Sequence, residues 1–387
     1  MAPARDRRRR LLRWIALGLA LLVLAGAAAG WWLYRKLEGN IRADASVAAE
    51  LERYERDRPR HLTDGAQNIL LIGSDTRSGK DNARYGRDKG TQRSDTAILL
   101  HLPADRKSAT AVSIPRDLVT EIPACLTADG SRTQAQRAQF NWAYQWGGAA
   151  CTIRTVEKLS GIRVDHHMVL DFGGFKKMVD AVGGVEVCVQ QPMNDPEAKL
   201  RLPAGRQLLH GEQALGFVRA RYSLGDGSDT ERMRRQQQFL GALVQKVQSN
   251  GVLLNPGRLY PLLDAATSSV TADPELASLR GLYELVRGVR DVPSDQVMFL
   301  TVPRRPYAAD PNRDELVEPD ADRLFSQLRA DQPLTVVPPS PTAPQPPAGP
   351  SPTDGPRTVY PWLVGTGAPP SPVPTFTGTT ADTPGCR

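Results

Sequence analysis

Short, almost uninterrupted apolar runs recur through the middle of this chain and alternate with segments whose apolar residues repeat at helical spacing. Such runs are typical of strands that are buried on both faces of a sheet. Their alternation with helices predicts an α/β fold, a layered α/β/α domain around a central mixed sheet. The predicted strands are 68–72, 96–102, 109–114, 164–170, 185–189 and 297–302. The predicted helices are 152–159, 172–182, 211–218, 231–247, 274–289 and 320–329.

A different apolar pattern occupies residues 14–34, which contain no charged side chain. As a helix this segment is long enough to cross a hydrocarbon core of about 30 Å. Five arginines between residues 7 and 13 precede it, so the positive-inside rule predicts a cytoplasmic N-terminus and an extracytoplasmic body. A cleaved signal peptide is the alternative, but Gly30 is followed directly by Trp31 and Trp32 rather than by a small, polar cleavage region. We therefore expect an uncleaved, single-pass anchor in the cell membrane.

The remaining chain divides by composition. We expect a juxtamembrane stalk that holds the domain away from the bilayer, an extracytoplasmic domain, and a Pro- and Thr-rich tail without the apolar period that a core requires. The predicted divisions are a cytoplasmic basic arm (1–13), the transmembrane signal anchor (14–34), the stalk (35–62), the domain (63–331) and a disordered tail (332–387).

The net charge of +7 first suggests a nucleic-acid binder, but its distribution does not. Residues 5–13 alone carry a net charge of +5, which leaves +2 for all other residues. The body of the protein therefore lacks the concentrated basic surface that phosphate-backbone binding needs. We expect no nucleic-acid partner.

The four cysteines are Cys125, Cys151, Cys188 and Cys386, and none has the C-x-x-C spacing of a zinc site. In an oxidising compartment two of them can pair. Cys125 and Cys151 are the best candidates, because both lie in loop-like sequence around residues 141–148.

Two carboxylates stand at strand ends in the predicted domain. Asp75 follows the strand 68–72, and Asp95 precedes the strand 96–102. Open α/β sheets place ligands at such ends, and two carboxylates can share one Mg²⁺. The alternative is that both aspartates only cap turns. The neighbouring segment 73–80 (GSDTRSGK) is not a P-loop, since five residues rather than four separate its glycine from Gly-Lys.

Arginines accumulate beside the same strand and helix ends. A guanidinium group matches phosphate oxygens in a two-point fork, so the set indicates a phosphate-binding site. Arg219 and Arg221 share a face only in extended backbone, so we expect the preceding helix to end near Phe217. A capping box at 228–231 would place Arg232 in the first turn of the next helix, where anions bind favourably, unless that helix face is merely solvated. The arginines concerned are Arg77, Arg93, Arg116, Arg219, Arg221 and Arg232.

Taken together, these segments resemble the LytR-CpsA-Psr family of bacterial cell-envelope proteins. The motifs that carry the resemblance are 68–77 (NILLIGSDTR), 93–96 (RSDT), 113–117 (SIPRD), 141–144 (NWAY) with Gly147-Gly148, 182–185 (VGGV), and 218–221 (VRAR) with Arg232 and Gln236. The resemblance implies a phosphotransferase that moves a glycopolymer from an undecaprenyl-pyrophosphate carrier onto peptidoglycan through a phosphodiester. It covers 67–238 strongly and the sequence to 331 more weakly.

The resemblance also assigns roles to individual residues. It implies Mg²⁺ (or Mn²⁺) held by Asp75 and Asp95, and Arg116 as the catalytic arginine with Asp117 in the same motif. The implied pyrophosphate-binding residues are Arg77, Arg93, Arg219, Arg221, Arg232 and Gln236. One departure is Arg137-Ala-Gln-Phe140, where members often carry a lysine. Two alternatives remain: a polyprenyl-pyrophosphate pyrophosphatase, and a polyprenyl-phosphate-binding regulatory protein, in line with the family's older label of transcriptional attenuator.

Overall fold

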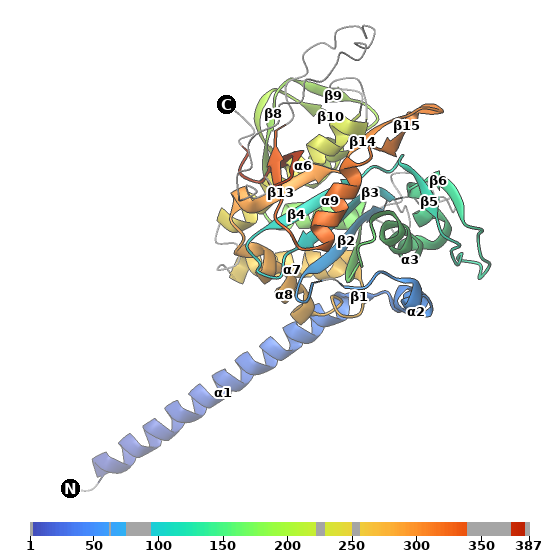
Figure 1. Cartoon of the computed structure of the whole chain (residues 1–387). Helices are drawn as coiled ribbons and strands as arrows, with labels where there is room; N and C mark the ends of the chain where they lie inside the picture. The colour runs from blue at the N-terminus through green and yellow to red at the C-terminus, as the bar shows by residue number, and fades with distance from the viewer. Residues whose placement is uncertain are drawn as a thin grey trace, which may run out of the picture.

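A central mixed sheet organises the domain in this computed structural model (Figure 1). The structure describes residues 3–61, 63–74, 94–221, 229–249, 256–338 and 373–383. Within these residues the sheet has nine strands, in the spatial order β1 (Arg42–Ala43), β12 (Val270–Ala272), β7 (His166–Asp171), β2 (Gln67–Ser74), β3 (Ser94–Leu102), β4 (Ala109–Ile114), β13 (Val297–Thr301), β17 (Thr375–Thr380) and β16 (Thr335–Val337).

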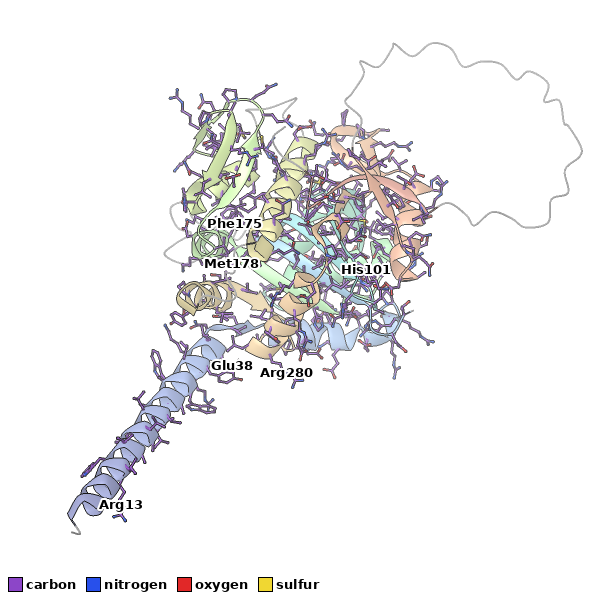
Figure 2. The ribbon with its side chains drawn as sticks, turned by 90° about the vertical axis from the view of Figure 1, so that its left-hand side faces the viewer. Arg13, Glu38, His101, Phe175, Met178 and Arg280 are labelled. Carbon is purple, nitrogen blue, oxygen red and sulfur yellow. A yellow bond between two sulfur atoms is a disulfide. The ribbon has the colours of Figure 1, made fainter. Side chains whose placement is uncertain are left out.

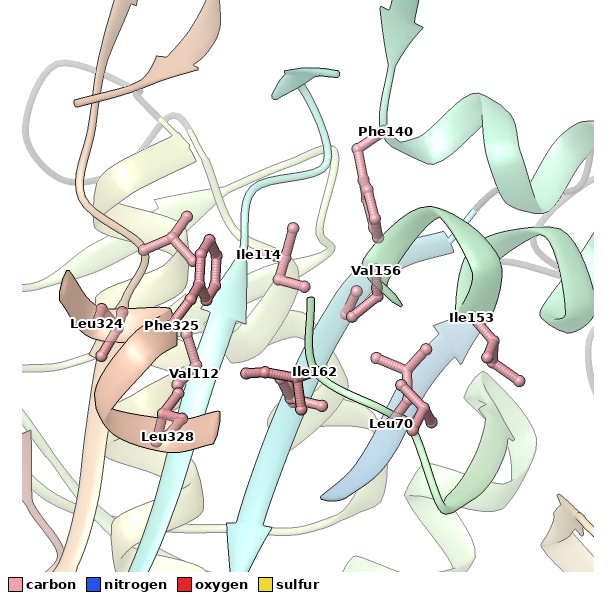
Figure 3. Close-up of a cluster of buried hydrophobic side chains, with 14 of the residues drawn as sticks. Leu70, Val112, Ile114, Phe140, Ile153, Val156, Ile162, Leu324, Phe325 and Leu328 are labelled. Atoms are coloured by element: carbon pink, nitrogen blue, oxygen red, sulfur yellow. The ribbon is translucent and has the colours of Figure 1, made fainter. Parts of the chain in front are cut away.

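Helices cover both faces of this sheet, which confirms the predicted α/β/α layers. On one face, Leu70 and Val112 of the sheet belong to one buried cluster with Ile153 of α3 and Phe325 of α9 (Figure 3). On the other face, the cluster around Phe299 includes apolar side chains of α6 and α8. The helices are α1 (Pro3–Asn40), α2 (Ala45–Arg53), α3 (Asn141–Ser160), α4 (Phe172–Ala181), α5 (Gly211–Arg219), α6 (Asp229–Ser249), α7 (Pro256–Ser269), α8 (Leu279–Arg290) and α9 (Asp320–Arg329).

Four short two-stranded sheets flank the central one in the described residues. They pair β5 (Val119–Ile122) with β6 (Gln136–Gln139), β8 (Val185–Val189) with β11 (Gly205–Leu209), β9 (Met193–Asp195) with β10 (Leu200–Leu202), and β14 (Arg304–Tyr307) with β15 (Asp310–Leu316). The predicted strand 185–189 therefore exists but pairs outside the central sheet. Together with α4 and α5, the strands β8–β11 form a second apolar cluster around Phe217 and Phe239.

Strand direction determines where the site lies. Strand β2 is parallel to β7, β4 is parallel to β13, and β3 is antiparallel to both β2 and β4. The carboxyl ends of β2, β4, β7 and β13 therefore meet at one edge of the sheet, together with the amino end of β3. This is the edge at which open α/β sheets bind ligands.

Helix α1 projects away from the domain (Figure 1). Among the described residues, its segment Leu12–Asn40 is the one helical stretch that is long and apolar enough to cross a membrane. The most apolar part of this segment contains no buried residue. This agrees with a single-pass membrane anchor.

The predicted stalk at 35–62 is wrong, because this segment packs on the domain. Residues 42–43 form β1 and pair with β12, and Val47 of α2 is buried in the main cluster. The guanidinium group of Arg58 donates to both carboxylate oxygens of Glu157 and to the carbonyl oxygen of Val164. Val47 and Leu51, one helical turn apart, supply the apolar face that the charged composition obscured.

The prediction of a wholly disordered tail is also wrong. Residues 335–337 and 375–380 form β16 and β17, and β17 pairs antiparallel with β13. Phe376 joins the main core, because the segment 375–380 (TFTGTT) is rich in β-branched residues and alternates burial along the strand. Residues 339–372 lie outside the described part of the chain.

A disulfide joins Cys125 to Cys151, the pair expected from the sequence. It ties the middle of α3 to the segment before β6, just after Gly147 and Gly148 interrupt the helical backbone. A Cβ at Gly147 would lie 2.8 Å from the Cβ of Cys151, so glycine is required for this close approach. Cys188 is disulfide-bonded as well, while Cys386 lies outside the described residues.

Candidate functional site

An apolar cavity of about 510 Å³ lies between the sheet and helices α4, α5 and α6. Its walls come from two layers that are distant in sequence. The sheet contributes Leu71, Ile98, Met168, Leu170 and Val270, and the helices contribute Phe172, Phe175, Met178, Leu215, Val218, Phe239 and Leu240. The rings of Phe175 and Phe239 lie 5.4 Å apart, and Figure 2 labels Phe175 and Met178 on α4. A cavity with this lining suits a hydrocarbon chain.

Charged groups gather at the sheet edge beside this cavity. Arg116, which follows β4, places Nη1 2.8 Å from Oδ1 of Asp95 at the start of β3. The Nε atom of Arg116 lies 3.2 Å from Oδ2 of Asp117 and 3.7 Å from Oδ1 of Asp229. One guanidinium group therefore contacts three carboxylates and still keeps 21% of its side chain exposed.

The first turn of α6 completes this group. Arg232 is 4% exposed, and its Nη2 atom lies 2.5 Å from Oδ1 of Asp229 and donates to the backbone oxygen of Asp95 at 3.3 Å. One turn later, Gln236 donates to Thr96 Oγ1 and to the Val218 carbonyl oxygen, both at 3.2 Å. The helix therefore packs its polar first turn against β3 rather than exposing it to solvent, contrary to the solvated alternative.

Arg219 and Arg221 also line the apolar cavity, although α5 continues to Arg219 and not merely to Phe217. The change of direction comes one residue later, since Ala220 has extended backbone dihedrals. The guanidinium carbon of Arg219 lies 4.5 Å from the centre of the Phe172 ring, and Nη2 of Arg221 lies 3.6 Å from Asp229 Oδ1. Cations thus surround the polar end of the cavity.

Three members of the charged cluster, Arg116, Asp117 and Arg232, have shifted pKa values, and burial lowers the pKa of Arg232. Burial by itself would lower the pKa of Arg116, but the carboxylates of Asp95, Asp117 and Asp229 outweigh that effect and raise it. Burial raises the pKa of Asp117; the Arg116 guanidinium opposes this rise, and the nearby Asp229 carboxylate adds to it. Arg116 therefore carries a permanent positive charge, and Asp117 retains its proton more readily than an ordinary carboxylate does.

Within the described residues, the structure therefore brings together Asp95, Arg116, Asp117, Arg219, Arg221, Arg232 and Gln236. Asp75, Arg77 and Arg93 lie outside the described residues. Sequence reasoning overlooked Asp229, which contacts three of the arginines, and Asp195, whose Oδ2 accepts from the Arg221 amide at 2.7 Å. The capping-box pattern at 228–231 was the available signal for Asp229, but by itself it indicates only a local helix start.

One of the two predicted metal ligands, Asp95, lies within the described residues. No group of three or more metal-binding His, Cys, Asp or Glu residues occurs among the described residues. Asp95 lines the cavity and its side chain is 27% exposed. One such carboxylate fits Mg²⁺, which is typically held by one or two carboxylates together with water and phosphate oxygens. The predicted second ligand, Asp75, follows Ser74 directly, at the carboxyl end of β2.

Comparison with known proteins identifies relatives of this chain. The model of the LytR_cpsA_psr family matches residues 38–330. A probable cell wall biosynthesis protein LcpB of Corynebacterium glutamicum is 37% identical over 263 residues, which cover 66% of this chain and 56% of that protein. The cell wall biosynthesis protein LcpA of the same species is 35% identical over 63% of this chain and 51% of its own length. The chain thus spans about half the length of these two relatives.

Other relatives are matched over most of their length. The polyisoprenyl-teichoic acid–peptidoglycan teichoic acid transferase TagT of Bacillus subtilis is 28% identical, over 76% of this chain and 88% of that protein. Among solved structures, a LytR-Csp2A-Psr enzyme from Actinomyces oris superposes with a TM-score of 0.55 at 20% identity, over 70% of this chain and 93% of that one. This structural likeness shows the shared fold.

Proposed function

The chain belongs to the LytR_cpsA_psr family, and we propose that it is a membrane-anchored phosphotransferase that moves a glycopolymer from a polyprenyl-pyrophosphate carrier, of the undecaprenyl type, onto peptidoglycan. Three relatives support the proposed acceptor and reaction, because their names describe transfer of teichoic acid to peptidoglycan.

One observation carries the proposal: an apolar cavity that ends in a cluster of arginines. A polyprenyl pyrophosphate has the same division, a long hydrocarbon chain joined to two phosphates. The walls formed by α4, α5 and the sheet would take the chain, and Arg116, Arg219 and Arg221 would take the phosphates. Burial of each CH₂ group contributes about 0.8 kcal/mol, so a long prenyl chain would be bound strongly.

The proposed orientation places the domain outside the membrane. The arginines at the N-terminal end of α1, ahead of its apolar segment, favour a cytoplasmic N-terminus by the positive-inside rule. Outside the membrane, cleavage of the donor pyrophosphate bond would supply the free energy for transfer, in place of ATP. The donor and the acceptor glycan would then both be reached from the domain side of the bilayer.

In the proposed reaction, an acceptor hydroxyl oxygen forms a bond to the phosphorus that carries the glycopolymer. The bond from that phosphorus to the bridging oxygen breaks, and prenyl monophosphate leaves. Arg116 and Arg232 would stabilise the negative charge that develops on the phosphate oxygens. Asp117, 3.2 Å from Arg116, would accept the proton of the acceptor hydroxyl.

We further propose that Asp95, with Asp75, holds Mg²⁺ beside the pyrophosphate. When bound, the ion would add positive charge next to the phosphate oxygens. The 2.8 Å contact between Asp95 and Arg116 supports this proposal, since it places the carboxylate that would hold the ion beside the guanidinium group that would bind the phosphates.

Filling the apolar cavity tests the donor site. Met178→Trp is expected to weaken binding of a long-chain prenyl pyrophosphate by about tenfold or more, because the indole would occupy space needed by the chain. A short-chain analogue should lose much less affinity. The matched control is Lys177→Trp, an exposed neighbour on the same helix that does not line the cavity. Equal affinities in wild type and Met178→Trp for the long-chain ligand would contradict the assignment.

The role of Asp117 predicts a pH dependence. Since burial raises the pKa of this carboxyl, it must lose its proton at a higher pH than the usual 3.8 before it can act as a base. The transfer rate should therefore fall, as pH decreases, at a higher pH than an ordinary aspartate would give. Asp117→Asn is expected to remove this acid limb and to lower the rate by about 10²–10⁴-fold. In Asp105→Asn, which changes an exposed carboxylate, the limb should remain; a limb that persists in Asp117→Asn would rule out this base.

A further inference from the structure

A second cavity of about 1020 Å³ lies on the other side of Arg116. Its walls come from the β14–β15 hairpin, the first turn of α6, and the strands β13 and β17. Its lining is more polar than that of the apolar cavity. Hydroxyl and amide side chains line it, namely Gln139, Thr230, Gln237, Thr301, Asn312, Thr377 and Thr379. We call this cavity the polar groove.

The two cavities meet at the charged cluster. Arg116 and Arg221 line both of them, whereas Asp95 lines only the apolar cavity and Asp117 only the polar groove. A donor held with its prenyl chain in the apolar cavity would therefore present its phosphates to the groove. The proposed base, Asp117, also lies on the side of the cluster that faces the groove.

The chemistry of the polar groove fits carbohydrate better than a polyanion. The arginines of its β14–β15 wall are already paired with carboxylates: Arg305 lies 2.8 Å from Glu315, Arg313 lies 2.8 Å from Asp310, and Arg304 pairs with Asp314. Several lining side chains already hydrogen-bond within the protein: Gln139, Gln237 and Asn312 donate, and Thr230 accepts from Arg304. The groove offers their remaining donor and acceptor positions, the hydroxyls of Thr377 and Thr379, and three prolines, Pro303, Pro306 and Pro311. Amides and hydroxyls match the hydroxyl and acetamido groups of a glycan, and proline rings can pack on the apolar faces of sugar rings.

One wall of the groove comes from the C-terminal segment 373–383, which lies beyond the residues that the family model matches. Thr377 and Thr379 of β17 line the groove. The strand is held in place, because Phe376 is buried and a Cβ at Gly378 would lie 2.5 Å from the carbonyl oxygen of Phe299. The wall is thus a fixed part of the domain.

We propose that the polar groove binds the acceptor glycan, and that the strand β17 is a specificity-determining wall of this acceptor site. The ligand class is a strand of N-acetylated amino sugars, with the accepting hydroxyl directed at Asp117. This inference rests on the proposed function and deepens it, since it assigns the second substrate to a place. It also makes the choice of acceptor depend on a segment outside the family-matched region.

The test narrows the groove from the β17 side. In Thr377→Trp, the full-length protein in detergent micelles is expected to bind glycan oligomers from peptidoglycan, freed of their peptides, about tenfold or more weakly than wild type. The matched control is Thr375→Trp, which changes an exposed threonine two residues earlier on the same strand that does not line the groove. It should bind the oligomers as wild type does. Binding of a prenyl pyrophosphate should be unchanged in both variants, which shows that both remain folded.

Direct glycan binding separates this inference from the proposed function. Loss of glycan binding in Thr377→Trp alone supports the groove even if no transfer is observed. If wild type does not bind the oligomers, or if Thr377→Trp and Thr375→Trp bind them equally well, the acceptor groove is overturned. A different result would contradict the proposed function: a wild-type protein that binds both substrates but forms no phosphodiester.

Discussion

Replacement of Arg116 by alanine is expected to lower the rate of glycopolymer transfer by about 10²–10³-fold, the usual effect of removing one group that stabilises transition-state charge. The guanidinium lies between the two cavities and contacts Asp95 at 2.8 Å and Asp117 at 3.2 Å. Its loss would remove the positive charge beside the reacting phosphate and leave three carboxylates near one another. The measurement is the rate of phosphodiester formation with both substrates at saturation.

Two further variants sharpen this prediction. Arg116→Lys keeps the charge but not the planar fork, so its rate should fall between those of wild type and Arg116→Ala. Arg280→Ala removes an arginine whose side chain is 88% exposed on α8 (Figure 2), and it should leave the rate unchanged. A wild-type rate in Arg116→Ala would remove this residue from the mechanism.

The second large effect concerns stability. Arg58→Ala is expected to destabilise the domain by about 3–5 kcal/mol, because it leaves the Glu157 carboxylate buried without its charged partner. The side chains of Arg58 and Glu157 are only 9% and 3% exposed, and the Nη2–Oε1 distance is 2.7 Å. The measurement is the free energy of unfolding in denaturant, followed by circular dichroism in detergent micelles.

Arg56→Ala provides the control, since Arg56 is exposed in the same segment and should change the stability by less than about 0.5 kcal/mol. A similar small change in Arg58→Ala would mean that residues 35–62 are a stalk after all. A large loss confined to Arg58→Ala would instead establish that the segment after the anchor is part of the domain.

The elements that the sequence predicted well are those in which local pattern and burial agree. Strand β4 is buried along its whole length, and the six-residue apolar run 109–114 matches its bounds. The helix 320–329 was predicted with its observed bounds, because its apolar side chains Leu324, Phe325 and Leu328 recur at helical spacing. Both patterns depend only on neighbouring residues.

The elements that were missed depend on distant partners. Residues 375–380 follow a proline-rich stretch, and their burial arises only because β13 offers an edge with which they can pair. Arg58 looks like an ordinary surface charge until Glu157 is brought beside it. The capping-box pattern accounts for Asp229 only as part of a local helix start, whereas its contacts with Arg116 and Arg221 come from two other segments of the chain. No local pattern contains that information.

The proposed transferase activity is tested most directly with the full-length protein in detergent micelles. The protein is mixed with a prenyl-pyrophosphate-linked oligosaccharide, peptidoglycan glycan and Mg²⁺. The products are then identified by mass spectrometry. We expect two products in equal amounts: prenyl monophosphate, and peptidoglycan that carries the oligosaccharide through a phosphodiester. Prenyl monophosphate accompanied only by free oligosaccharide phosphate would mean that water is the acceptor, and donor binding without turnover would mean a binding protein. Either result would contradict the proposed transferase.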